Sequence, residues 1–375
     1  MRKLQMVDLK GQYEKIKDQV DKAVIDVIDS TAFINGPEVK QFQEDFEKYL
    51  DVKHVIPCAN GTDALQIAMM GLGLKPGDEV ITTDFTFAAT VEVIALLNLT
   101  PVLVDCDINN MNISIKAIKK AITSKTKAIV PVHLFGRAVD MDAVMALAEE
   151  HNLYVIEDNA QAVGGVYTSK EGKKKLGTIG DVGTTSFFPS KNLGCYGDGG
   201  AIFTNNDELA HTIRGIVNHG MYERYHHDVV GVNSRLDSVQ ATILKIKLPY
   251  LDGYNKARQK AAMYYSDKLG VNENVIVPII CDTCDCHVFH QYVIRITNGK
   301  RDGLLEYLQS KQIPCAIYYP IPLHRQKAYL DDRYKEEDFS VTNRLSDEVI
   351  ALPMHTELDR EQQDHIINTI LNYIN

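Results

Sequence analysis

Short apolar runs alternate with longer amphipathic segments from about residue 50 onward. The apolar runs, rich in branched side chains, predict seven strands at residues 54–58, 79–83, 101–105, 128–133, 153–158, 184–188 and 200–204. The segments between them have helical periodicity and predict helices at 62–73, 86–97, 114–123, 138–150 and 207–218. This alternation is typical of a mostly parallel sheet covered by helices.

The pattern differs at the two ends of the chain. Apolar residues at spacings of three and four predict one amphipathic helix over 10–30. After residue 235 we expect a long helix over 236–269 interrupted near Pro249, a strand over 288–296, and helices near 301–310, 343–351 and 359–373. We therefore predict a large α/β/α domain over residues 1–235 and a smaller C-terminal α+β domain over 236–375.

Composition narrows the class of protein. Of 375 residues, 45% are apolar and 24% charged, which predicts a globular fold with room for two domains. The formal charge of −10, from 40 basic and 50 acidic side chains, weighs against a protein that mainly binds nucleic acid or an anionic membrane. Seven scattered cysteines, no signal-peptide pattern and no apolar run of roughly 18 residues favour a reduced cytoplasmic protein.

Two features could bind an anion and a cation at the sheet edge. At residues 58–70 a strand end is followed by a glycine turn and a helix, so the first-turn amides of Gly61 and Thr62 could hold a phosphate. An ordinary helix start capped by Asn60 or Thr62 explains the same residues. Asp158 closes a strand, where its carboxylate could meet a cationic nitrogen, although a loop-forming aspartate is an equal alternative.

A third feature is Lys191, which lies in a glycine-rich stretch with few charges at 185–201. A lysine held in such a setting loses its proton easily and can form a Schiff base with an aldehyde. Taken alone, an exposed loop lysine is the simpler interpretation. Together, however, a phosphate turn, a strand-end acid and this lysine are what a pyridoxal phosphate enzyme requires.

The chain also resembles the DegT/DnrJ/EryC1/StrS family of pyridoxal phosphate sugar aminotransferases. The resemblance covers essentially the whole chain and is carried by motifs at residues 7–10, 35–39, 59–65, 157–161, 186–191, 231–237 and 319–324. It implies fold type I of the aspartate aminotransferase superfamily, pyridoxal 5'-phosphate as cofactor, and a homodimer with shared active sites.

The resemblance also implies roles for individual residues. Lys191 would carry the cofactor and move protons, and Asp158 would pair with the pyridine nitrogen. Gln161 would lie near the ring hydroxyl, and Phe87 would stack on the ring. The residues implied at the phosphate are Gly61, Thr62, Ser186 and, from the neighbouring subunit, Asn233.

The substrates implied by the resemblance are L-glutamate and a nucleotide-linked keto sugar. Lysine at position 191, where sugar dehydratases of the family carry histidine, favours transamination. The motifs look most like those of enzymes that aminate C-3 of UDP-2-acetamido-2-deoxy-3-oxo-glucuronate for surface polysaccharides such as the O-antigen of lipopolysaccharide. Arg235 could then bind the sugar carboxylate, or could form an interface ion pair instead.

Three further positions match the family's substrate side, namely Tyr318, Tyr319 and His324, although His324 could be a polar loop residue. The alternative substrate is a dTDP-linked 3-keto-6-deoxyhexose, which lacks the carboxylate. A protein of this fold that binds nucleotide sugars without turnover is a non-enzyme alternative, and the pairing of Lys191 with Asp158 argues against it.

Cysteines and histidines between Cys281 and His290 could suggest a zinc site by composition. Their spacing does not match ordinary zinc motifs, because Cys284 and Cys286 are too close and no second cysteine pair follows. We therefore predict no metal and a reduced loop before a strand.

Overall fold

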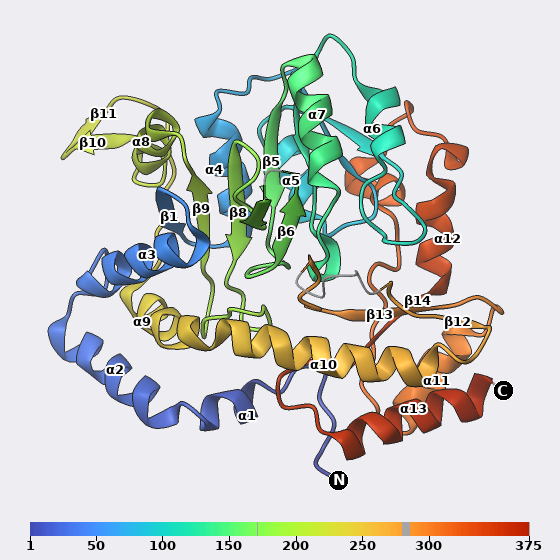
Figure 1. Ribbon diagram of the computed structural model, residues 1–375. Coiled ribbons are helices and arrows are strands. Elements are labelled where there is room, and N and C mark those ends of the chain that lie inside the picture. The colour runs from blue at the N-terminus through green and yellow to red at the C-terminus, as the bar shows by residue number, and fades with distance from the viewer. Residues whose placement is uncertain (171, 280–285, 375) are drawn as a thin grey trace.

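The computed structural model describes residues 1–170, 172–279 and 286–374, and its centre is a seven-stranded sheet. The strands lie in the order β1-β9-β8-β5-β4-β2-β3 (Figure 1). From β3 to β8 neighbouring strands run parallel, whereas β9 is antiparallel to both β8 and β1. Their bounds are β1 (His54–Cys58), β2 (Glu79–Thr83), β3 (Thr100–Val104), β4 (Thr126–Val130), β5 (Tyr154–Asp158), β8 (Val182–Ser186) and β9 (Gly200–Thr204). The predicted seven-stranded, mostly parallel sheet is confirmed.

Both faces of this sheet are buried, which explains why its strands are apolar without strict alternation. Ile56, Val80 and Ile156 face a core shared with α4 (Gly61–Gly71), α5 (Ala89–Leu96) and α8 (Asp207–Ile216). Alternate residues of the strands face the opposite core, which is covered by α3 (Pro37–Leu50), α6 (Ile115–Ala121) and α7 (Met141–His151). The result is the expected α/β/α arrangement.

The C-terminal part is built on a second, antiparallel sheet. Its strands are β12 (Val275–Ile276), β13 (Tyr292–Ile296) and β14 (Val349–Leu352), with β13 in the middle. It shares a core with α10 (Leu251–Leu269), α11 (Arg301–Ser310) and α13 (Arg360–Ile374), while α12 (Ser340–Glu348) leads into β14. In Figure 1, α10 runs from the large sheet to this second sheet.

The helix that precedes α10 belongs to the core of the large sheet. Helix α9 (Ser238–Lys247) packs against α3 and places Ala241 and Leu244 beside Phe42 and Phe187. A short 3-10 turn containing Pro249 separates α9 from α10, which confirms the predicted interruption.

Several local predictions are wrong. Residues 10–30 form two helices, α1 (Leu9–Glu14) and α2 (Lys17–Ser30), and α3 was not predicted. Residues 349–351, predicted as helix, belong to β14, because a short buried apolar run has no periodicity that distinguishes strand from helix. Strand β7 (Gly172–Lys175), which pairs with β6 (Val166–Ser169), was not predicted either.

A second hairpin, formed by β10 (Met221–Glu223) and β11 (His226–His227), projects beyond α8 (Figure 1). None of the helices in the described part of the chain combines the length and the apolarity that a membrane crossing needs.

Candidate active site

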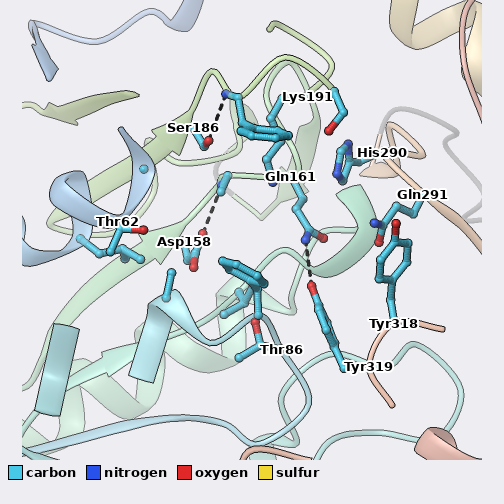
Figure 2. Close-up of a pocket in the computed structure, with 18 of the residues that line it drawn as sticks. Thr62, Thr86, Asp158, Gln161, Ser186, Lys191, His290, Gln291, Tyr318 and Tyr319 are labelled. Atoms are coloured by element: carbon cyan, nitrogen blue, oxygen red, sulfur yellow. Dashed lines mark hydrogen bonds between the residues drawn. The ribbon is translucent and has the colours of Figure 1, made fainter. Parts of the chain in front are cut away.

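A cavity of about 680 Å³ opens where β2, β5 and β8 end. Ligands of open α/β sheets bind at this edge, beyond the carboxyl ends of the parallel strands. Figure 2 shows its walls, which come from the start of α4, the loops after β2, β5 and β8, the stretch before β13, and the segment 317–320.

The start of α4 presents backbone donors to this cavity that have no hydrogen-bond partner in the described chain. The Asn60 side chain accepts a hydrogen bond from the Asp63 amide at 2.8 Å and so caps the helix. The amides of Gly61 and Thr62 precede it in the first turn, where no intrahelical acceptor exists. Both residues and Ser186 line the cavity. The cap and the anion site are therefore compatible features of one helix start.

Glycine is required at position 61 because β8 approaches it closely. A Cβ atom at Gly61 would lie 2.7 Å from Cβ of Ser186, which is closer than real side chains come. The same turn is tied to residue 234, because the Ala59 amide donates to the Ser234 hydroxyl at 3.1 Å and that hydroxyl donates to Asp63 at 2.6 Å.

Asp158 ends β5 with its carboxylate buried and oriented. The Thr90 hydroxyl on α5 donates to Oδ2 at 2.8 Å, and the Ala160 amide donates to Oδ1 at 3.2 Å. The preceding residue, Glu157, accepts hydrogen bonds from His133 and from three backbone amides at 177, 179 and 180. The end of β5 is thus fixed on both sides of the sheet.

Lys191 reaches the cavity from the loop between β8 and β9. Burial lowers the pKa of Lys191 to about 8, and the nearby charge of Asp158 opposes that effect. The neighbouring Asn192 is buried and donates to the Asn255 side chain at 2.7 Å and to the Val288 carbonyl at 3.0 Å. The lysine is therefore easily deprotonated and sits on an anchored loop.

An exposed aromatic ring and an oriented amide complete this side of the cavity. Phe87 is 58% exposed although it follows a buried strand. Gln161 accepts from the Phe135 amide at 2.6 Å, which turns its NH₂ group toward the Tyr319 hydroxyl, 3.3 Å away (Figure 2). Burial raises the pKa of Tyr319, so its phenol stays protonated.

These groups fit pyridoxal phosphate. The free first-turn amides of α4 and the Ser186 hydroxyl can take the phosphate, and the buried Asp158 can take the protonated pyridine nitrogen. Phe87 offers a flat apolar face to the ring, and Lys191 an amine that loses its proton near neutral pH.

The proposed substrate residues separate into two groups. Tyr318 and Tyr319 line the cavity. His324 does not: its Nδ1 lies 2.7 Å from the buried Asp84, and its ring stacks on Phe339.

Asn233 and Arg235 also lie outside this cavity. Asn233 is exposed, and the Arg235 guanidinium is 3.5 Å from the Asn218 side chain. Within the described ranges, no carboxylate lies within 4.0 Å of Arg235.

Sequence reasoning missed several lining or supporting residues, namely Thr86, Thr90, His290 and Gln291. Thr90 begins a helix near a strand end, which is a weak signal. His290 was considered only as part of a cysteine-rich segment, of which Cys281 and Cys284 lie outside the described residues. Among the residues that are described, no cluster of three or more side chains suited to a metal ion is found.

The chain matches one family of known proteins over nearly its whole length. The model of the DegT/DnrJ/EryC1/StrS aminotransferase family matches residues 14–371. A "pleiotropic regulatory protein" of Geobacillus stearothermophilus is 45% identical over 370 residues, 98% of each chain. The UDP-2-acetamido-2-deoxy-3-oxo-D-glucuronate aminotransferase of Pseudomonas aeruginosa is 44% identical over 356 residues, 95% of this chain and 96% of that protein.

The fold is also similar to that of solved structures from the same family. A DegT/DnrJ/EryC1/StrS aminotransferase from Brucella abortus superimposes with a TM-score of 0.93 at 40% identity, covering 99% of this chain and 100% of that one. The predicted fold class, enzyme class and cofactor are confirmed, because aminotransferases of this family depend on pyridoxal phosphate. This chain belongs to the DegT/DnrJ/EryC1/StrS aminotransferase family.

Proposed function

We propose that this enzyme transfers the amino group of L-glutamate to C-3 of a UDP-linked 3-keto sugar, UDP-2-acetamido-2-deoxy-3-oxo-glucuronate, for surface polysaccharide synthesis. The observation that carries the reaction type is the convergence of Lys191, Asp158 and the start of α4 on one cavity. The similarity to the Pseudomonas aeruginosa enzyme supports the choice of sugar.

The residues of the chain have separable tasks in this reaction. Bound pyridoxal phosphate supplies an electron sink for the carbon that is deprotonated. Asp158, held by Thr90, would pair with the pyridine nitrogen and stabilise a positive charge there. Burial lowers the pKa of Lys191 to about 8, so its amine is neutral far more often than that of an exposed lysine and could take a proton from the substrate and return it. Gln161 and Tyr319 would bind the side of the ring that carries the hydroxyl.

The sugar carboxylate is assigned to Arg235. In the described chain, the one hydrogen-bond partner of this half-buried guanidinium is the Asn218 amide oxygen, and a planar guanidinium pairs well with a carboxylate. Because Arg235 and Asn233 lie outside the cavity of their own chain, we propose that they serve the cavity of a second subunit. Exposed apolar side chains along α2 and after it, at Ile25, Ile28, Phe33 and Ile34, support a homodimer.

We also propose that the chain divides into functional parts, a cofactor part at 1–235 and a smaller part at 236–375. Helix α9 would then be the connection, since its apolar side chains pack into the core of the large sheet.

The substrate is tested by offering UDP-2-acetamido-2-deoxy-3-oxo-glucuronate and a dTDP-linked 3-keto-6-deoxyhexose side by side with glutamate, and measuring product masses. We expect amination of the UDP-linked sugar and, for Arg235→Ala, a rise of roughly 10- to 100-fold in KM for it, as for a lost charged hydrogen bond. Preferential use of the dTDP-linked sugar, or an unchanged KM in Arg235→Ala, would contradict the proposed substrate.

A further inference from the structure

One wall of the cavity has no task in the reaction described above. It consists of His290 and Gln291, which lie just before β13. His290 is only 6% exposed, and its Nδ1 atom is buried without a hydrogen-bond partner in the described chain, as is Oε1 of Gln291. Figure 2 places both residues on the side of Lys191 and Tyr318, across the cavity from Thr62 and Asp158.

The backbone of this wall is held rigidly from two directions. The buried Arg258 guanidinium donates from Nη1 to the carbonyls of Phe289, His290 and Met354 at 3.0–3.3 Å. From the other side, the backbone N–H of Gln291 donates to the Phe135 carbonyl at 3.3 Å.

Gly136 allows this second contact. It has a φ of +95°, and a Cβ atom there would lie 2.9 Å from the His290 amide nitrogen. The backbone that carries the imidazole is thus held on both sides, while the buried Nδ1 has no hydrogen-bond partner in the described chain. Both residues line the cavity, so a ligand bound there is the expected partner for the polar groups that this preorganised wall presents to it.

The wall is also electrically neutral. Burial lowers the pKa of His290 well below its usual range, and the positive charges of Lys191 and Arg258 lower it further. A neutral imidazole has one donor and one acceptor, and the Gln291 amide is likewise uncharged. Apart from its reacting amine, glutamate offers carboxylates, which bind best to cations. A keto sugar with an acetamido group offers hydroxyl and amide groups, which match a neutral donor and acceptor.

We propose that His290, with Gln291 beside it, is a sugar-recognition residue of the second half-reaction and contacts a hydroxyl or acetamido group of the nucleotide sugar, not the amino donor. This proposal rests on the proposed function, because it requires a keto sugar as the acceptor. It assigns the two substrates to different groups of one cavity, with the neutral wall reserved for the sugar.

The test measures the two half-reactions separately in the pyridoxal phosphate-loaded enzyme. For His290→Phe, which keeps a ring of similar size, we expect the KM for the UDP-linked keto sugar to rise roughly tenfold, the effect of one lost buried hydrogen bond. The rate at which glutamate alone changes the visible absorbance should stay within about twofold of the wild type, because that step does not use the wall. Gln291→Leu should show the same asymmetry.

His287→Phe is the matched control. His287 lies three residues earlier, is equally buried and stacks on Phe289, but it does not line this cavity. We expect the KM of the His287→Phe enzyme for the sugar to be unchanged. His290→Asn keeps a neutral donor and acceptor and should lie closer to the wild type than His290→Phe does.

The opposing outcomes are distinct. A His290→Phe enzyme that loses both half-reactions equally, or neither, would overturn the assignment, as would a His290→Asn variant that is as impaired as His290→Phe. A wild-type enzyme that reacts with glutamate but aminates no keto sugar would overturn the proposed function, and the role of His290 would fall with it.

Discussion

At the scale of single residues, the orientation of Asp158 depends on a neighbour that never needs to touch the substrate. The carboxylate has two oxygens, and the Thr90 hydroxyl occupies a lone pair of Oδ2 at 2.8 Å. Thr90 is itself only 1% exposed, so no water can replace its hydroxyl without rearrangement. Asp158 lines the cavity, and this hydrogen bond helps to fix the orientation of its carboxylate there.

Replacing this hydroxyl by a methyl group of similar size tests its role. We expect Thr90→Val to lower kcat roughly tenfold, which corresponds to the loss of one buried hydrogen bond to a charged group. Thr90→Ser keeps the hydroxyl and should retain near wild-type turnover. Steady-state kinetics with glutamate, combined with thermal unfolding, separate this effect from instability. A Thr90→Val enzyme with unchanged kcat would show that Asp158 is oriented without it.

The sequence located Lys191 and Asp158 because both stand where local patterns have a meaning, at the end of a strand and in a glycine-rich loop. The partners of these residues could not be predicted in the same way. Thr90 and Asp158 are 68 positions apart, and Asn192 meets Asn255 across 63 positions. Such contacts depend on how helices pack on the sheet, which no local pattern encodes.

At the scale of elements, the loop that carries Lys191 is anchored to the helices that connect the two sheets. Lys247 on α9 is 1% exposed and donates from Nζ to the Gly194 carbonyl at 2.6 Å. Asn255 on α10 holds Asn192, the neighbour of Lys191. Both contacts join the loop to residues that lie far from it in the sequence. Helices α9 and α10 therefore support the loop that carries Lys191, and α10 also packs on the C-terminal sheet.

This anchoring has a measurable pH dependence. Burial lowers the pKa of Lys247 from 10.5 to about 8. Between these values the unfolded chain binds a proton that the folded chain does not, so the free energy of unfolding rises with pH. Relative to Lys247→Met, the wild type should gain roughly 2 kcal/mol of stability between about pH 8 and pH 10. Urea titrations at each pH measure this difference, and parallel curves for the two proteins would contradict a depressed pKa.

Element prediction was correct where short apolar runs alternate with longer helical segments, as in the seven strands of the large sheet, and at the break near Pro249. It was wrong at residues 349–351, which together with Leu352 form β14 because β13 supplies a partner strand. The register of that pair, Tyr292 opposite Leu352, joins segments about 60 residues apart in sequence. A tertiary partner decided the outcome there.

At the scale of the whole molecule, a net charge of −10 coexists with a site for phosphorylated ligands. Anion binding is assigned to local groups, namely the first-turn amides of α4 and the Ser186 hydroxyl, so it requires no basic surface. The same composition that excluded a nucleic-acid binder is therefore compatible with a nucleotide-sugar enzyme. The proposed recognition of the sugar at His290 likewise depends on local uncharged groups, whose positions and hydrogen bonds would distinguish the ligands of the cavity.

The central claim is that the enzyme, with Lys191 as its proton-transfer residue, moves nitrogen from glutamate to a nucleotide sugar, and isotope tracing tests it most directly. The enzyme, loaded with pyridoxal phosphate, is incubated with ¹⁵N-labelled glutamate and UDP-2-acetamido-2-deoxy-3-oxo-glucuronate, and the sugar product is analysed by mass spectrometry. We predict one ¹⁵N atom in the product of the wild type and none with Lys191→Ala. An unlabelled sugar from the wild type, or a labelled one from Lys191→Ala, would contradict this account.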